Sequence, residues 1–93
     1  MATGERIMIK LYTGTNCVAC KALKKRLHLL GVESFYTECD TADQENRDAI
    51  MALGYRSIPV LVKYKDGSVV DTLGGNVHSD SDYEDFFKEF YRD

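Results

Sequence analysis

The sequence predicts an α/β fold with the element order βαβαββα, in which a four-stranded mixed sheet is flanked by helices. Apolar segments of strand length alternate with segments of helical periodicity, a strong hairpin turn stands late in the chain, and an amphipathic helix closes it. A right-handed βαβ unit followed by a hairpin and a helix produces such a sheet, with helices on both faces. The 93 residues, 44% of them hydrophobic, are enough for one core and too few for two.

The first predicted strand covers residues 7–12, which are apolar with a β-branched bias and lead into a cluster of turn formers. A helix is predicted to begin near Cys17, because apolar residues recur from there at steps of three and four. Asn16 or Thr15 is expected to cap this helix, since short polar side chains accept hydrogen bonds from its first free N–H groups. Gly31 supplies the C-terminal stop.

The second strand is predicted within residues 32–39. Phe35 and Cys39 share a period-two phase there, so both side chains are expected to point into the core. Cys39 is therefore interpreted as a structural thiol. Asp40 and Thr41 are the expected caps of a second helix, which ends at a glycine.

A hairpin and a helix complete the predicted fold. Residues 57–64 are predicted to form a central strand and residues 68–73 its partner, because Asp66-Gly67 is a strong turn signal between them. Residues 81–84 match a capping box, which predicts the start of the final helix. Aromatic residues recur along it at helical spacing, and we expect this stripe to pack on the sheet. The stripe consists of Tyr83, Phe86, Phe87, Phe90 and Tyr91.

The composition narrows the classes of function. A net charge of -3 argues against general nucleic-acid binding, which needs an excess of basic residues on one surface. The longest apolar stretch, residues 58–62, is far shorter than the roughly 20 residues of a membrane span, and no signal peptide is recognisable, so we expect a cytoplasmic protein without membrane contact. Residues 1–6 are interpreted as a flexible leader and residues 7–93 as one domain, which needs no partner to complete its core and is expected to be a monomer.

The chemistry of the chain is predicted at a Cys-X-X-Cys pair, Cys17 and Cys20, where the first strand leads into the helix. The free N–H groups and the positive end of the helix dipole favour a thiolate on Cys17. Cysteines in such positions have pKa values of roughly 3.5 to 7.5, against about 8.5 for a free thiol. We therefore predict that Cys17 is the nucleophile and that Cys20 resolves the mixed disulfide formed on it.

A Cys-X-X-Cys pair is also half of a common zinc site, but a second pair is missing from the sequence. Cys39, His28 and His78 are the other candidate ligands. Because Cys39 is expected in the core and neither histidine has a patterned partner, we predict no metal site.

Basic residues follow the thiols in the predicted helix, at Lys21, Lys24, Lys25 and Arg26. Such a run is usually a solvated helix face. The functional interpretation is that Lys21 and Lys24 lower the thiol pKa further and attract an acidic segment of a partner.

Several short motifs resemble the glutaredoxin and NrdH-redoxin branch of the thioredoxin superfamily, over about residues 7–91. They are Leu11-Tyr12-Thr13 before the thiols, the thiol pair itself, Gly54-Tyr55-Arg56-Ser57-Ile58-Pro59-Val60 ahead of the third strand, and Gly74-Gly75 after the fourth. The valine after the first cysteine and the X-X-Pro-Val phrase resemble NrdH-redoxins more than ordinary glutaredoxins. Small redoxins of this mixed type are familiar from bacteriophages. The resemblance implies the thioredoxin fold.

The same resemblance implies a substrate groove beside the thiols. It makes Pro59 a cis proline opposite them, with the Ile58 backbone offering hydrogen bonds to a substrate strand, and it lines the groove with Thr13, Asn16 and Gly75. The residues by themselves leave the choice between a cis and a trans Pro59 open, because a proline that begins a central strand marks either a special turn or an ordinary strand start.

The resemblance also implies a function. The chain is expected to be a dithiol electron donor without a bound cofactor that reduces protein disulfides, with ribonucleotide reductase as the client. Its reducing equivalents are expected from thioredoxin reductase and NADPH or from glutathione. Residues 14–16 lack the lysine with which glutaredoxins usually bind glutathione, and residues 76–78 intervene between the double glycine and the polar, acidic helix start that usually follows it. The aromatic and glycine-rich phrase typical of NrdH-redoxins is missing as well.

Three alternatives stay open from the sequence. The chain is a glutathione-dependent glutaredoxin, an iron–sulfur or metal-binding module in which Cys17 is a ligand, or a non-catalytic regulator that binds its partner through the thiol pair.

Overall fold

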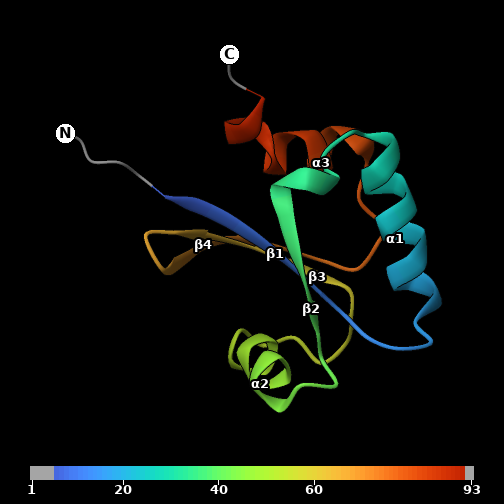
Figure 1. The fold of residues 1–93 in the computed structure, drawn as a ribbon, viewed down its shortest axis with the longest axis vertical. Coiled ribbons are helices and arrows are strands. Elements are labelled where there is room, and N and C mark those ends of the chain that lie inside the picture. The colour runs from blue at the N-terminus through green and yellow to red at the C-terminus, as the bar shows by residue number, and fades with distance from the viewer. Residues whose placement is uncertain (1–5, 92–93) are drawn as a thin grey trace.

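The computed structural model describes residues 6–91, which form a four-stranded mixed sheet with helices on both faces (Figure 1). In chain order the elements are β1 (Ile7–Thr13), α1 (Val18–Leu29), the short 3₁₀ helix η1 (Glu33–Phe35), β2 (Tyr36–Asp40), α2 (Gln44–Ala52), β3 (Val60–Lys65), β4 (Ser68–Gly74), α3 (Asp80–Phe86) and a second 3₁₀ helix η2 (Lys88–Phe90). The strand order is β2-β1-β3-β4, with β1 parallel to β2 and antiparallel to β3. The predicted fold class and element order are confirmed.

One face of the sheet carries α1 and α3 together (Figure 1). Its core is built from apolar residues of β1, β3 and both helices, because each helix turns its apolar stripe toward the sheet. The aromatic residues Tyr83, Phe86 and Phe87 of the final helix and its cap are buried here, as the stripe predicted. Phe90 is partly buried against the same core, whereas Tyr91 is exposed.

The other face carries α2 alone (Figure 1). Ile50 of α2 packs there on Tyr12, Val60 and Val62. Cys39 is partly buried against this cluster, as predicted. The prediction that Phe35 points to the same side of the sheet is wrong. Phe35 lies in η1 and packs on the opposite face, because the chain becomes extended only at the next residue.

The helix caps differ from the sequence prediction. Cys17, not Asn16 or Thr15, is the N-cap of α1, and Asn16 sits in the preceding turn with a φ of 57°. The N-cap of α2 is Asp43, whose carboxylate accepts from the N–H of Glu45. Each turn contains several residues that are able to cap a helix. The residue that does so is the one at which the backbone enters the helix.

The two residues expected to cap α2 serve the turn before it. Asp40 accepts from the N–H of Ala42, and the Thr41 hydroxyl donates to the carbonyl of Thr13. The capping box of α3 begins at Ser79, with Asp82 as its acidic member, two residues earlier than the predicted Ser81.

The predicted hairpin turn is confirmed. Asp66 and Gly67 connect β3 to β4 with φ values of 53° and 87°, the left-handed conformations that a two-residue hairpin turn of this hand requires. β3 begins only at Val60, because the residues before it form the loop that contains Pro59.

Of the predicted leader, residues 1–5 lie outside the described part of the chain. Arg6 is tied to the hairpin turn, since its N–H donates to the Asp66 carboxylate and its carbonyl accepts from the Asp66 N–H. Within residues 6–91, the helices are too short and too polar to span a membrane.

Candidate active site

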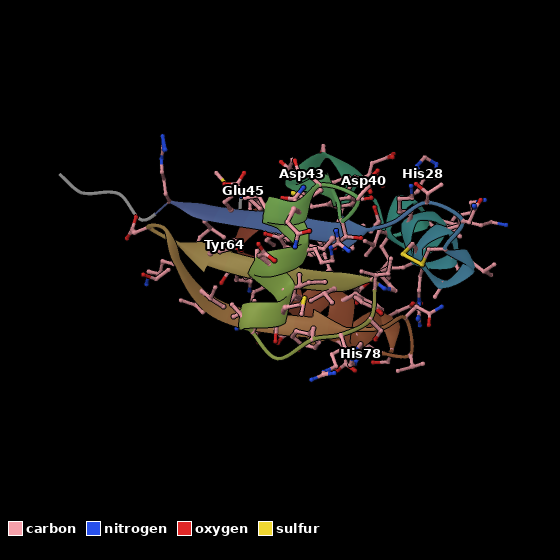
Figure 2. All side chains as sticks on the ribbon, turned by 90° about the horizontal axis from the view of Figure 1, so that it is seen from below. His28, Asp40, Asp43, Glu45, Tyr64 and His78 are labelled. Atoms are coloured by element: carbon pink, nitrogen blue, oxygen red, sulfur yellow. A yellow bond between two sulfur atoms is a disulfide. The ribbon has the colours of Figure 1, made fainter. Side chains whose placement is uncertain are left out.

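Cys17 and Cys20 meet at the N-terminal end of α1, where they form a disulfide with Cα atoms 5.2 Å apart. Figure 2 shows this disulfide as the yellow link between two sulfur atoms at the start of the helix. Because Cys17 is the N-cap, its Sγ accepts a hydrogen bond of 3.1 Å from the backbone N–H of Cys20. The structure therefore places the predicted pair at the positive end of the helix dipole.

The two cysteines differ in their access to solvent. Cys20 is 1% exposed, whereas Cys17 is only partly buried. α1 has no acidic residue in its first turn, so no carboxylate competes there for the free N–H groups. In the reduced protein the N–H of Cys20 stabilises a negative charge on Cys17, because a hydrogen bond to the charged form favours that form. The geometry suits Cys17 for attack on an outside disulfide and Cys20 for attack from within.

Ile58 and Pro59, two of the predicted groove residues, lie at the end of the sheet from which the chain runs to Cys17. Tyr12 pairs with Val60 in the antiparallel ladder of β1 and β3, so the chain leaves β1 toward Cys17 where Pro59 enters β3. The Ile58-Pro59 peptide bond is cis, as the family resemblance implied, and Pro59 is fully buried.

Two glycines lie against this segment, where the family resemblance predicts a substrate groove. The N–H of Gly75 donates to the carbonyl of Pro59 at 2.8 Å, which brings the double glycine after β4 beside the cis proline. A Cβ atom on Gly14 would stand 2.6 Å from Cδ1 of Ile58, so the loop before Cys17 closes directly on that side chain. Gly14, Ile58, Pro59 and Gly75 are thus brought together at the end of the sheet from which the chain runs to Cys17.

Thr13 and Asn16 are placed differently. Thr13 is 3% exposed and its hydroxyl donates to Glu38 at 2.8 Å, while its carbonyl accepts from Thr41. Asn16 is exposed in the turn before Cys17. The Thr13 side chain therefore serves the packing of β1 on β2, and a substrate contact of either residue stays a prediction.

The basic run of α1 divides into two pairs. Lys24 Nζ lies 3.0 Å from Glu38 of β2, and Arg26 Nε lies 2.7 Å from Asp80 at the start of α3. The hydrogen bond from Thr13 and the bond and charge of Lys24 lower the pKa of Glu38 below its usual value. Lys21 and Lys25, by contrast, are exposed. Lys24 and Arg26 therefore hold α1 to β2 and α3, whereas Lys21 and Lys25 face solvent.

Sequence reasoning missed two hollows that flank the Ile58 loop. One, of about 350 Å³, lies toward α2 and is lined by Thr41, Arg47, Ile50, Met51, Tyr55, Arg56, Ser57 and Ile58. The other, of about 420 Å³, lies toward β4 and is lined by Tyr55, Ser57, Thr72, Leu73, Gly74, Gly75 and His78. Tyr55 and Ser57 form the wall between them. Arg56 and Tyr55 stand inside the motif ahead of Pro59, which was the available signal; Arg47 and His78 gave none.

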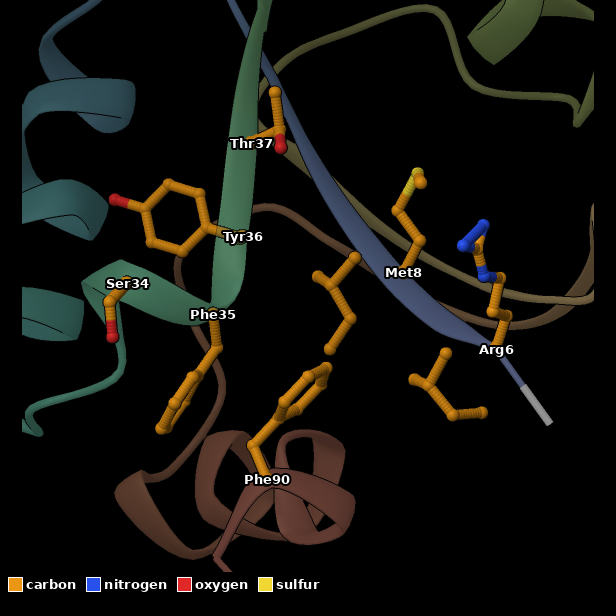
Figure 3. A pocket seen from close by; sticks show the side chains of 9 residues that line it. Arg6, Met8, Ser34, Phe35, Tyr36, Thr37 and Phe90 are labelled. Carbon is orange, nitrogen blue, oxygen red and sulfur yellow. The ribbon is translucent and has the colours of Figure 1, made fainter. Parts of the chain in front are cut away.

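A third hollow, of about 350 Å³, lies at the beginning of β1, the end of the strand away from the disulfide (Figure 3). Its lining includes Arg6, Met8 and the stacked rings of Phe35 and Phe90, whose centroids are 4.9 Å apart. It is separate from the groove described above.

The side chains considered as zinc ligands are dispersed. Cys39 lies against the α2 face of the sheet, where burial raises its pKa, with a smaller opposing effect of Lys10. His28 contacts Glu33, and His78 contacts the carbonyl of Gly74 at 2.8 Å. Between residues 6 and 91, no three Cys, His, Asp or Glu side chains form a group that could hold a metal ion.

A family model described as Glutaredoxin matches residues 9–70, a stretch that contains both cysteines. The chain belongs to the glutaredoxin family. Its Cys-X-X-Cys pair and family membership make this glutaredoxin a thiol–disulfide oxidoreductase. A search of curated proteins finds no match to the chain.

Solved structures of thioredoxins share the fold of this glutaredoxin. Mitochondrial thioredoxin 3 from Saccharomyces cerevisiae matches with a TM-score of 0.67 at 21% identity, over 89% of this chain and 77% of its own. Fasciola hepatica thioredoxin matches with a TM-score of 0.67 at 18% identity, over 90% and 80%. The short form of thioredoxin f from spinach chloroplast matches with a TM-score of 0.63 at 23% identity, over 92% and 74%. These similarities confirm the predicted thioredoxin fold.

Proposed function

We propose that this glutaredoxin is a dithiol electron donor that reduces disulfides of other proteins, with ribonucleotide reductase as its client. The observation that carries the proposal is the asymmetry of the pair: Cys17 is accessible at the N-cap, and Cys20 is buried one turn inside the same helix. The choice of client is supported by the NrdH-like residues around the thiols and Pro59.

The reaction needs both thiols. The Cys17 thiolate attacks one sulfur of the client disulfide, and the other client sulfur leaves as a thiolate and takes up a proton. Cys20 then loses its proton and attacks Sγ of Cys17, which releases the second client sulfur. Two electrons pass to the client, and the protein is left with the Cys17–Cys20 disulfide seen here.

Ile58 and Pro59 are proposed to align the client during this exchange. The Ile58 side chain lies against the loop that leads to Cys17, and the Ile58-Pro59 peptide bond is cis. Gly75 supports the same segment through its hydrogen bond to Pro59, and its lack of a side chain leaves the groove open above the double glycine.

A client complex tests this proposal directly. With Cys20→Ser, the first step is expected to stop at a mixed disulfide between Cys17 and the client, which can be captured from a lysate and identified by mass spectrometry. Cys17→Ser in the same background is the matched control and is expected to capture nothing. Equal capture by both variants, or no ribonucleotide reductase among the captured proteins, would contradict the assignment of thiols or of client.

The hollow toward α2 favours glutathione as a second candidate reductant beside thioredoxin reductase. Arg47 and Arg56 both line it, next to Ile58, and a guanidinium pairs with carboxylates such as those of glutathione. None of the ion pairs found among residues 6–91 uses Arg56, and the hydrogen bond found there for the Arg47 guanidinium goes to the neutral amide of Gln44. We propose that these cations replace the lysine absent from residues 14–16.

NADPH oxidation by the oxidised protein separates the two reductants. One cuvette contains thioredoxin reductase, and the other contains glutathione with glutathione reductase. Turnover in the second cuvette that falls roughly tenfold in Arg56→Gln, a loss of about 1.4 kcal/mol for one charged contact, would assign the arginine pocket to glutathione. Turnover in the first cuvette alone would identify an NrdH-like donor.

A further inference from the structure

The face of α1 that points away from the core is both apolar and basic. Cys20, Leu23 and Leu27 occupy the buried side of the helix. On the other side, Val18 is 81% exposed and Leu29 is 75% exposed. Ala22, Lys21 and Lys25 are exposed on the same side, because steps of three and four residues return to one helix face.

The basic residues of α1 that form ion pairs border its buried side, and those that do not lie on its exposed side. Lys24 and Arg26 border the buried side, one toward β2 and the other toward α3, and each pairs with an acidic residue there. Lys21 and Lys25 lie between these borders. α1 itself contains no Asp or Glu, although acidic residues outnumber basic ones in the whole chain. The ion pairs found in residues 6–91 therefore leave two lysines unneutralised beside the exposed apolar side chains.

We propose that this surface, Val18, Lys21, Ala22, Lys25 and Leu29, binds an acidic segment of the client that flanks its reactive cysteine. The inference rests on the proposed function and adds to it a rule for client recognition. Carboxylates on the client complement the two lysines, and Val18 and Leu29 offer apolar contacts before and after them along the helix.

The spacing of the lysines sets the spacing of the acidic residues. Along the helix axis Lys21 lies roughly 6 Å and Lys25 roughly 12 Å from Cys17, at 1.5 Å per residue. An extended peptide advances roughly 3.3 Å per residue and turns alternate side chains to the same side. A client cysteine bonded to Cys17 therefore brings the residues two and four positions away from it to the two lysines.

Symmetric peptide disulfides provide the probe. Each is a disulfide-linked dimer of a single-cysteine peptide, so that either sulfur presents the same flanks. One peptide carries Glu two and four positions to each side of the cysteine, a second carries the same number of Glu at one and three positions, and a third carries Gln in place of Glu at two and four. The second peptide matches the first in net charge and differs only in register.

The reduced protein is expected to reduce the first peptide about tenfold faster than the Gln peptide at low ionic strength, because complementary charges raise the rate of encounter. The advantage is expected to shrink to less than about twofold at 1 M salt, where the Debye length is about 3 Å. The peptide with Glu at one and three positions is expected to gain at most about threefold, from encounter without register.

Substitutions assign the effect to the two lysines. Lys21→Gln with Lys25→Gln is expected to abolish the difference in rate between the first peptide and the Gln peptide. Lys21→Arg with Lys25→Arg is expected to retain it. Lys88→Gln removes an exposed charge at η2, away from the disulfide helix, and serves as the matched control without effect.

Each of the other results overturns the proposal. Equal rates for the first peptide and the Gln peptide would exclude an acidic partner, and equal rates for the two Glu peptides would exclude the assigned register. Equal slowing of all three peptides in the Lys21→Gln, Lys25→Gln variant would show that the lysines act on the Cys17 thiolate instead of the client. Failure to reduce even the Gln peptide would be a failure of the proposed function itself.

Discussion

The two faces of the sheet bury hydrophobic clusters of different size. The face under α1 and α3 buries a cluster of nine residues that includes three aromatic rings, whereas the face under α2 buries a cluster of four. The disulfide helix stands on the heavily packed face and is also tied by ion pairs to β2 and α3. The hollow that contains Arg47 and Arg56 opens on the lightly packed face. The reactive thiols are therefore held by the strongest part of the core, and the wall beside them belongs to the weaker part.

The largest expected effect on stability comes from truncating one buried side chain in each of the two clusters. Phe87→Ala removes a fully buried ring from the α1 and α3 face and is expected to lower the free energy of unfolding by about 3 to 5 kcal/mol. Ile50→Ala on the α2 face is expected to cost about 2 kcal/mol, near the lower end for such a substitution, because a single helix can settle into the space. Urea denaturation of both variants measures the difference, and equal losses would contradict the comparison.

A glycine at the groove tests how firmly the α2 face holds its aromatic wall. Gly74→Ala would place a Cβ atom 2.6 Å from the ring of Tyr55, whose hydroxyl bonds to Thr72 at 2.7 Å. Because the ring is held at both ends, we expect a loss of about 1 to 3 kcal/mol in chemical denaturation. The loss should largely disappear in the Tyr55→Leu background. An equal loss in both backgrounds would mean that the ring does not resist the added methyl group.

The free cysteine reports on the same face in a different way. Burial raises the pKa of Cys39, Lys10 lowers it and Glu38 raises it, with a net rise above the value of a free thiol. In a protein with Cys17→Ser and Cys20→Ser, iodoacetamide at pH 8 is expected to alkylate Cys39 more slowly in the folded state than in urea, because the thiol is partly buried and the thiolate is the reactive form. Equal rates would show that this face opens readily.

The smallest expected effect concerns the ion pair between α1 and β2. The pKa of Glu38 is lowered in the folded protein, so its contribution to stability is present above the usual pKa of 4.5 and is lost as the pH falls through the folded value. Because both partners are more than a third exposed, Glu38→Gln is expected to cost less than about 1 kcal/mol at pH 7 and progressively less as the pH falls through the folded pKa of Glu38. Glu84→Gln, an exposed residue of α3, is the control; a pH-independent loss in Glu38→Gln would contradict the ion-pair explanation.

Much of the fold was predictable because its signals are local. The hairpin at Asp66-Gly67, the aromatic stripe of the last helix and the placement of Cys17 at a helix start each follow from residues close together in the chain. The caps were harder. Asn16, Asp40 and Ser81 are all good capping residues by type, but Cys17, Asp43 and Ser79 take those positions, since a cap is chosen by where the backbone turns.

The groove shows the same limit. Ile58, Pro59 and Gly75 were identified from motifs and do come together, whereas Thr13, from an equally recognisable motif, turns its hydroxyl to Glu38. Arg47 had no motif at all, because a residue of α2 reaches the pocket only through the packing of that helix on the sheet.

The sequence by itself determined the element order, the reactive pair and the family, since periodicity, a turn signal and a Cys-X-X-Cys at a helix start are properties of adjacent residues. Only the tertiary structure decided which lysines of α1 are neutralised and which face solvent. That choice depends on Glu38 and Asp80, residues 14 and 54 positions away from their partners in the chain, which long-range packing brings within 3.0 Å. The sequence of one helix does not show which acidic residues of other elements pack beside it.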